Sequence, residues 1–211
     1  MAAPQDRGIY LASRSPRRRE LLTQIGVRYH LLLFRERADS APEVNEEPLA
    51  GEAPDVYVER VARAKAEVGW TRMLQRNLPH APVLSADTTV ALDGRIFGKP
   101  ADRNDAARML AALAGKSHEV LTAVAIKWGD DLHAALSRSE VRFKSLSEAE
   151  IREYAATGEA DDKAGAYGIQ GRAAKFVAEL RGSYSGVMGL PLYETAQLLE
   201  RIALSRPTRS L

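Results

Sequence analysis

Four arginines stand within six residues, from Arg14 to Arg19, and they follow a short apolar run at 9–12. Pro16 suits the first turn of a helix, so a helix is expected to begin just after Ser13. Amide groups at a helix N-terminus are free to bind phosphate, and arginine adds paired hydrogen bonds to phosphate oxygens. The pattern predicts binding of an oligophosphate. The alternative is an N-capping serine followed by solvated arginines.

A second candidate is the carboxylate of Asp87, which stands in the run SADTT at 85–89, within a stretch rich in β-branched residues. Aspartate is uncommon in strands, and a carboxylate buried there is costly unless it pairs with a cation or binds a metal. Asp87 is therefore a candidate for acid–base or metal chemistry. The alternative is an edge strand that turns this side chain to water.

Three loops contribute further polar groups. Lys99 stands on a rigid turn at 97–100 and could contact a phosphate as a point charge. The segment 161–171 has three glycines within seven residues, beside Tyr167, which can stack on a base, and Gln170, whose amide can read a base edge. The segment 182–191 is a loop of small residues. The alternatives are an exposed turn lysine, a surface loop and an ordinary entry to a helix.

Together these segments predict a nucleotide site in which cations hold the phosphates, carboxylates hold a divalent cation and a glycine-rich loop holds the base. Neither a GxxxxGK[ST] phosphate loop nor a GxGxxG fingerprint occurs in the chain, so the common nucleotide-binding folds are not indicated. His118 is expected to be a polar turn residue rather than a metal ligand, because no second histidine stands at ligand spacing.

Charge is balanced over the chain but not along it. The 211 residues include 30 Lys and Arg against 28 Asp and Glu, a net charge of +2, which excludes a strongly basic nucleic-acid-coating protein and an acidic disordered tail protein. Residues 1–40 carry a net +4 and residues 41–60 a net −5. This arrangement suits an anion bound through a cation; two solvated surface stretches are the alternative. The lack of cysteine excludes disulfides, thiolate zinc sites and a cysteine nucleophile.

Hydrophobic period and turn signals predict the elements that position these residues. Asp93 and Gly94 indicate a hairpin turn, and Ser147 with Glu150 forms a capping-box pattern. The acidic stretch 38–54 is expected to be a loop. Helices are expected over 16–26, from 55 onward, and over 101–114, 147–156 and 192–202, and strands over 9–12, 29–34, 83–92, 95–97, 119–127, 132–143 and 176–180.

Strands and helices are mixed without strict alternation, which predicts an α/β fold with a mixed, twisted sheet, split into two lobes around a ligand cleft. Residues 1–204 are expected to form a single domain and 205–211 a frayed tail. The apolar runs fall far short of the ~20 residues that span a bilayer, and no signal peptide is indicated. A cytoplasmic protein with no membrane partner is expected.

Six motifs, in order along residues 9–199, resemble the Maf family. They are SRSPRRRELL at 13–22, SADTTV at 85–90, GKP at 98–100, LAGKSHEVLTAVAI at 113–126, DKAGAYGIQG at 162–171 and GSYSGVMGLPL at 182–192. The resemblance implies a nucleoside triphosphate pyrophosphatase, which cuts between the α- and β-phosphates. It also implies an inosine-triphosphate-pyrophosphatase-like (Maf/Ham1) fold, a divalent metal cofactor, Mg²⁺ or Mn²⁺, and a homodimer.

Matched residue by residue, the resemblance implies that Asp87 is the catalytic carboxylate, which accepts a proton from the attacking water. A second acid of the family matches Glu46, counted back from Tyr57, and the two acids are the implied metal ligands. The implied contacts to the substrate phosphates are Ser13, Arg17, Arg18, Lys65 and Lys99.

The family has subgroups with different substrates. The residues that distinguish the subgroup acting on dTTP, UTP and some modified pyrimidine triphosphates match Arg17, Thr88 and Gln170, so the resemblance implies pyrimidine substrates. A second subgroup, acting on 7-methyl-GTP, is the alternative. Another alternative is a nucleic-acid-binding regulator of septum formation; the net charge of +2 and the aromatic content of 6% argue against it.

Overall fold

The computed structural model describes residues 8–33 and 44–205 of the chain. Its strands are β1 (Ile9–Leu11), β2 (Tyr29–Leu31), β3 (Val83–Leu92), β4 (Arg95–Phe97), β5 (Ser117–Trp128), β6 (Asp131–Phe143) and β7 (Val177–Arg181). Its helices are α1 (Pro16–Gln24), α2 (Pro54–Gln75), α3 (Arg103–Leu113), α4 (Glu148–Ala156), α5 (Tyr184–Met188) and α6 (Leu192–Ser205), with 3₁₀ turns η2 (Ala164–Ala166) and η3 (Arg172–Phe176).

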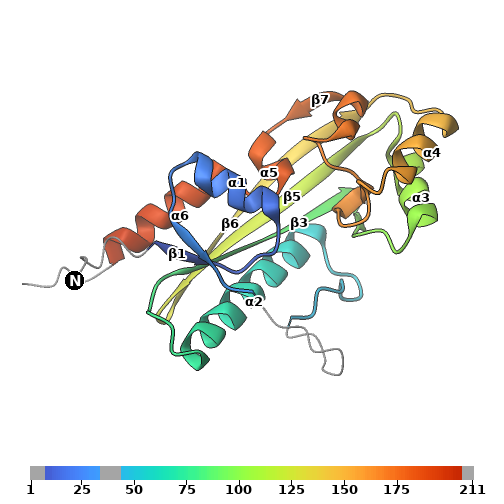
Figure 1. Cartoon of the computed structure of the whole chain (residues 1–211). Helices are drawn as coiled ribbons and strands as arrows, with labels where there is room; N and C mark the ends of the chain where they lie inside the picture. The colour runs from blue at the N-terminus through green and yellow to red at the C-terminus, as the bar shows by residue number, and fades with distance from the viewer. Residues whose placement is uncertain (1–7, 34–43, 206–211) are drawn as a thin grey trace, which may run out of the picture.

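The seven strands form one mixed sheet in the order β2-β1-β3-β5-β6-β7, with β4 paired to β3. β1 runs parallel to β2 and β3, whereas the pairs β3–β4, β3–β5, β5–β6 and β6–β7 are antiparallel. Strands β3, β5 and β6 are long and form the axis of an elongated molecule (Figure 1). The predicted α/β fold with a mixed sheet is therefore confirmed.

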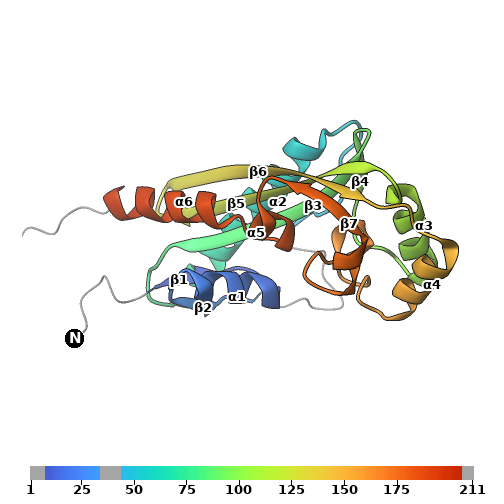
Figure 2. The same cartoon turned by 90° about the horizontal axis from the view of Figure 1, so that it is seen from above.

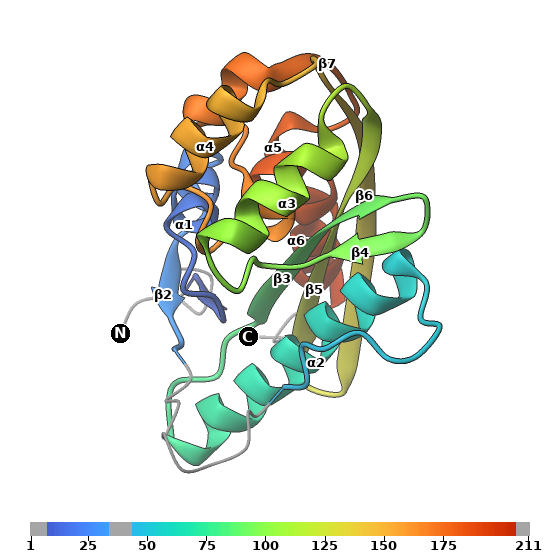
Figure 3. The same ribbon diagram turned by 90° about the vertical axis from the view of Figure 1, so that its right-hand side faces the viewer.

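The helices cover the two faces of this sheet and its far end. In Figure 1, α2 lies below the strands, and α1, α5 and α6 lie above them. Figure 2, turned to look from above, shows α6 running along β5 and β6. Helices α3 and α4 stand side by side at the end of the long strands, in front of the sheet in Figure 3. No helix in the described ranges is long and apolar enough to cross a membrane.

The molecule has two lobes, because its buried apolar side chains form separate hydrophobic cores. Around α3 and α4, buried side chains of both helices pack on the ends of β3 to β6; this α3–α4 core includes Leu110, Phe143, Tyr154, Tyr167 and Phe176. In the other lobe, α1 and α6 bury leucines and isoleucines against one face of the sheet. Helix α2 buries valines and alanines, which recur at helical spacing, against the opposite face. The lobes thus share the long strands but not their cores.

Most predicted elements are present, and three expectations were wrong. The strand at β2 ends at Leu31, although it was expected to reach 34. The segment 182–191, expected to be a loop, contains the short helix α5. His118, expected in a turn, lies in β5 and is buried. Of the predicted tail, residue 205 ends α6, and 206–211 lie outside the described residues, as do 38–43 of the predicted acidic loop.

Candidate active site

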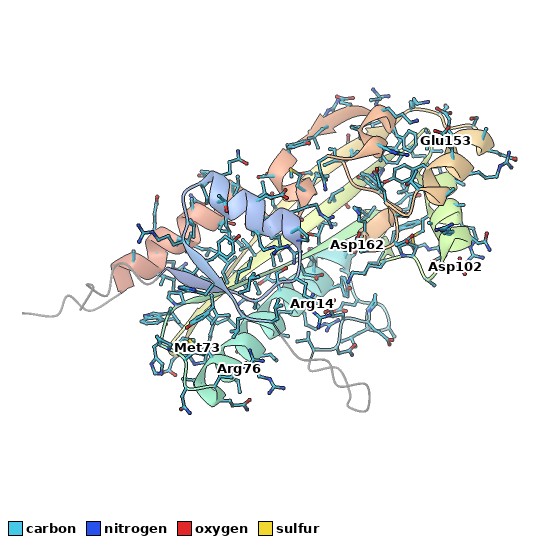
Figure 4. The ribbon with its side chains drawn as sticks, viewed as in Figure 1. Arg14, Met73, Arg76, Asp102, Glu153 and Asp162 are labelled. Carbon is cyan, nitrogen blue, oxygen red and sulfur yellow. The ribbon has the colours of Figure 1, made fainter. Side chains whose placement is uncertain are left out.

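A cleft of about 850 Å³ opens between the two lobes. Its walls come from the entry to α1, the loop before α2, the middle of β3, the turn after β4 and the loop that follows α4. Arg14 lies on the α1 side of this cleft, and Asp162 lies on the α3–α4 side (Figure 4). All nine site residues predicted from the sequence line it: Ser13, Arg17, Arg18, Glu46, Lys65, Asp87, Thr88, Lys99 and Gln170.

Strand β3 sends neighbouring side chains to opposite faces of the sheet, as a strand must. Asp87 points to the face covered by α2, where its Oδ1 accepts a hydrogen bond from Lys65 Nζ at 2.8 Å. Thr88 points to the other face, where its hydroxyl lies 3.3 Å from a guanidinium nitrogen of Arg18. Both residues still line the cleft. One dipeptide therefore supplies groups to two walls of the site.

Lys65 holds two carboxylates at once. Its ammonium lies 2.8 Å from Asp87 Oδ1 and 2.9 Å from Glu46 Oε2. Partial burial works to raise the pKa of the Glu46 carboxyl, but the charge and hydrogen bond of Lys65, with help from Lys99 and Arg18, outweigh burial and lower it. Glu46 is therefore held in its charged form. Lys65, Asp87 and Glu46 therefore form one ion-paired group in the cleft.

Glu46 is held in place by backbone contacts on both sides. Arg60, on α2, donates to the carbonyl oxygens of Asn45 and Glu47, both at 3.0 Å. The same guanidinium forms a paired contact with the Glu52 carboxylate, at 2.6 and 2.8 Å, and this contact lowers the pKa of Glu52 to about 2. Arg60 therefore fixes the loop at three points.

A second anchor for this loop is Tyr57, whose hydroxyl donates to the carbonyl oxygen of Glu46 itself, at 2.8 Å. Sequence reasoning missed both Arg60 and Tyr57 as parts of the site. An arginine and a tyrosine in a helix have no distinguishing sequence signal, because their partners are backbone oxygens of a loop with no regular pattern.

At the entry to α1, two serines and an arginine form a local hydrogen-bond network. Ser15 caps the helix, and its hydroxyl accepts from the amide of Arg18. The Ser13 oxygen accepts from the amide of Ser15 at 3.2 Å and from Arg18 Nη1 at 3.1 Å. Both acceptor positions of Ser13 are used, and its proton has no acceptor among the residues that the structure describes, so the hydroxyl can donate to a ligand in the cleft that it lines. That is the group an anionic oxygen needs.

Arg18 joins the α1 wall of the cleft to the sheet and to α5. Besides Ser13 and Thr88, it binds the carbonyl oxygen of Gly189 through Nε, at 2.7 Å. Within the described part of the chain, three of the five guanidinium N–H groups have protein partners and two have none. Arg18 thus supports the site's shape and still offers charge to it.

The opposite wall is the segment that follows α4. Arg17 Nη2 lies 3.9 Å from Asp162 Oδ2, so an ion pair reaches between the lobes. Lys163 donates a hydrogen bond to Asp162 Oδ1 at 2.7 Å. Its side chain also lies close to Gly168: a Cβ added to Gly168 would be 2.9 Å from Cε of Lys163. Lys163 is a further cation of the cleft that the sequence did not single out as a site residue.

Gly165 shows why this wall needs glycine. Its φ is +67°, and a Cβ would stand 2.7 Å from a methyl group of Val90 on β3. The amide of Gly165 also donates to the carbonyl oxygen of Gly98, beside Lys99, at 3.1 Å. The segment is therefore pressed directly onto the strand that carries Asp87.

The carboxylates fit a divalent cation that binds together with a phosphate ligand. Asp87 and Glu46 offer the hard oxygen donors that Mg²⁺ and Mn²⁺ prefer, and both reach the same point in the cleft, at Lys65. In the ranges that the structure describes, no three His, Cys, Asp or Glu side chains gather into a complete protein ligand set. Mg²⁺ is commonly held by one or two carboxylates plus substrate phosphates, so two acids are sufficient.

The chain is similar to several known proteins. A family model described as Maf-like protein matches residues 8–202. A protein of Aromatoleum aromaticum named dTTP/UTP pyrophosphatase is 61% identical over 91% of this chain and 94% of its own. Proteins with the same name from Nitrosospira multiformis and Nitrosomonas europaea are 59% and 53% identical, over 93% and 97% of this chain and 95% and 99% of their own. The solved Ham1 protein of Staphylococcus aureus aligns with 93% of this chain and 97% of its own, at 14% identity and a TM-score of 0.49.

Proposed function

The chain belongs to the Maf family, and on that premise we propose that it hydrolyses dTTP and UTP to the monophosphate and pyrophosphate. The observation that carries the proposal is the ion-paired group of Asp87, Lys65 and Glu46, placed across the cleft from the arginine-rich entry to α1. Such a cleft brings a proton acceptor and metal-binding oxygens to one end of a phosphate chain. The names of the similar proteins support the same substrates.

Asp87 is the proposed general base. Its Oδ1 is fixed by Lys65, while Oδ2 has no hydrogen-bond partner within the described part of the chain and is left to accept a proton from water. The water oxygen forms a bond to the α-phosphorus, and the bond from that phosphorus to the bridging oxygen breaks. The electron pair of that bond leaves with pyrophosphate, and the proton goes to Asp87.

The phosphate chain needs positive charge and hydrogen-bond donors. We assign these roles to Ser13, Arg17 and Arg18 on the α1 side and to Lys65 and Lys99 on the facing side. Asp87 and Glu46 would hold Mg²⁺ or Mn²⁺, which when bound neutralises charge on the phosphate oxygens. Arg17 would exchange its ion pair with Asp162 for a phosphate oxygen, since that pair is long at 3.9 Å.

Gln170 is the proposed reader of the base. Uracil and thymine present the same edge, the O4 acceptor beside the N3–H donor, and an amide complements both groups. Cytosine presents the reverse pattern. Because a free amide could turn over and pair with cytosine as well, selection requires a side chain held in one orientation.

The oligomeric state and the compartment stay predictions. A homodimer, a cytoplasmic location and a single domain over residues 1–204 are proposed from the family resemblance and the sequence. The roles given to the nine cleft residues have the same standing, supported by their placement in a single cleft.

A panel of nucleoside triphosphates tests the proposal. Pyrophosphate release would be measured with Mg²⁺ or Mn²⁺ for dTTP, UTP, CTP, GTP, ATP and 7-methyl-GTP. The proposal expects dTTP and UTP to have the highest kcat/KM and inorganic phosphate to be absent from the products. Preference for 7-methyl-GTP, or steeply salt-dependent nucleic-acid binding with no hydrolysis, would contradict it.

A further inference from the structure

Base selection by Gln170 depends on what holds its turn. We propose that His118 is a positioning residue for this turn, acting through its hydrogen bond to Tyr167. The inference rests on the proposed function and adds a specificity-determining residue at a distance from the substrate. His118 is not among the residues that line the cleft, so it acts only through others.

Within the residues that the structure describes, His118 has one polar contact, and that contact leads to the turn. The residue lies in β5 and is 2% exposed. Its Nε2 is 2.8 Å from the hydroxyl oxygen of Tyr167. The imidazole otherwise packs edge-on against the rings of Phe143 and Tyr167, with centroids 4.9 and 5.5 Å away. Burying a polar ring among apolar side chains costs free energy unless the ring is hydrogen-bonded. The hydrogen bond to Tyr167 offsets part of that cost.

The remaining polar atom of His118 supports the same interpretation. Nδ1 is buried with no hydrogen-bond partner in the described residues. Burial also lowers the pKa of His118 to about 4, so the ring is neutral near pH 7. If Tyr167 donates to Nε2, the single unpaired group is Nδ1–H. In the opposite arrangement the Tyr167 proton and Nδ1 are both unpaired, so donation by Tyr167 is favoured.

Tyr167 transmits this constraint to the turn. Gly165 and Ala166, directly before it, have φ of 67° and 60°, a conformation that a non-glycine residue holds only under restraint from its surroundings. Tyr167 and Ile169 are both buried in the α3–α4 core, on either side of Gly168. Fixing the Tyr167 ring therefore fixes the chain at the start of the turn.

The turn itself is closed by hydrogen bonds. The amide of Gly171 donates to the carbonyl oxygen of Gly168 at 3.0 Å, which makes 168–171 a β-turn with Gln170 at its third position. The amide of Gly168 donates to the hydroxyl of Tyr154, on α4, at 3.4 Å. Gln170 is exposed and lines the cleft, whereas Ile169 before it is buried and Gly171 after it is half-buried. The anchors beneath the turn thus fix the backbone that carries the Gln170 side chain.

Two amide variants of the same position test the proposal. In His118→Gln the amide can occupy the place of Nε2 and keep the bond to Tyr167, whereas the shorter amide of His118→Asn reaches only the place of Nδ1. The measured quantity is the ratio of kcat/KM for UTP to kcat/KM for CTP, with enough enzyme to quantify the slower reaction. For His118→Asn we expect the ratio to fall by about tenfold, the equivalent of one hydrogen bond, and for His118→Gln to stay within about threefold.

Two further variants separate positioning from general damage. Tyr167→Phe removes the same hydrogen bond from the other side and replaces His118→Asn if that variant does not fold; its ratio should fall equally. Thr195→Val removes a buried hydrogen bond of 2.7 Å in α6 and should lower Tm without changing the ratio.

The outcomes are distinct. Equal losses on UTP and CTP in the His118 and Tyr167 variants would overturn the positioning role, as would a drop in the ratio for Thr195→Val. If wild-type protein releases no pyrophosphate from UTP, the proposed function itself fails.

Discussion

Arg60 offers a sharp test of how the acidic loop supports catalysis. Arg60→Lys keeps the positive charge but replaces the planar guanidinium with a single ammonium group. One ammonium cannot donate to the carbonyl oxygens of Asn45 and Glu47 and to the carboxylate of Glu52 at the same time. The hydrogen bonds that are lost are those to the backbone carbonyl oxygens on either side of Glu46. A shift of about 1 Å in a group at the reacting centre costs about 100-fold, so kcat/KM for UTP should fall by about that factor.

The assay is pyrophosphate release at saturating Mg²⁺, with circular dichroism to show that the fold is retained. Arg63→Lys is the matched control, because Arg63 lies on the same helix and pairs with Glu59 away from the cleft, and its activity should not change. If Arg60 acts only through Glu46, then Arg60→Lys adds nothing to the loss caused by Glu46→Gln. Wild-type activity in Arg60→Lys, or a further loss in the double variant, would refute the reasoning.

Four further predictions follow from the geometry. Asp87→Asn should lower turnover by about 10²–10⁴, the usual contribution of a positioned base, and a loss of only a few-fold in direct pyrophosphate measurements would rule out that role. Gln170→Glu, which replaces the amide donor with an acceptor, should reduce the preference for dTTP and UTP over CTP; an unchanged substrate profile would exclude base reading by this residue. Gly165→Ala should destabilise the protein by more than Gly26→Ala in urea denaturation. Both have positive φ, which costs about 1–2 kcal/mol in a non-glycine residue, but a Cβ at Gly26 meets nothing within 4 Å, and equal losses would show that the contact is relaxed. Because burial lowers the pKa of His118 to about 4, the unfolded chain gains this proton at a higher pH than the native state, and stability is lost as the pH falls from about 6.5 towards 4. Between pH 7 and pH 5 the wild type should therefore lose about 2 kcal/mol more than His118→Gln, and equal losses would contradict the assignment.

Elements specified by local pattern were predictable from the sequence. The β-branched run and the Asp93-Gly94 turn are enough for the β3–β4 hairpin, since both strand composition and turn geometry are short-range properties. Ser147 and Glu150 form a capping box at α4 for the same reason. Asp87, Lys99 and Gln170 became candidates through residue type and local setting. Glu46 and Lys65 were added only by the family resemblance, which carries information that no single segment contains.

What the sequence did not predict depends on contacts between distant segments. Helix α5 is five residues of low helix propensity, and the carbonyl of Gly189 at its end is bound by Arg18, 171 positions earlier in the chain. His118 follows polar residues that resemble a turn, and its enclosure is built from Phe143 and Tyr167, which no local pattern connects to it. Tertiary packing, rather than propensity, decided both cases.

The separation of the two hydrophobic cores bears on how this enzyme can change over evolution. Lys65 stands on α2, which packs in its own core, whereas the turn with Gln170 is anchored in the α3–α4 core. Substitutions that share no packing partners have nearly additive effects. Under the roles proposed for these residues, we therefore expect substitutions near the Gln170 turn and near Lys65 to change kcat/KM almost independently. A lineage could then alter its base preference in one lobe while the hydrolytic rate, set in the other, stays the same.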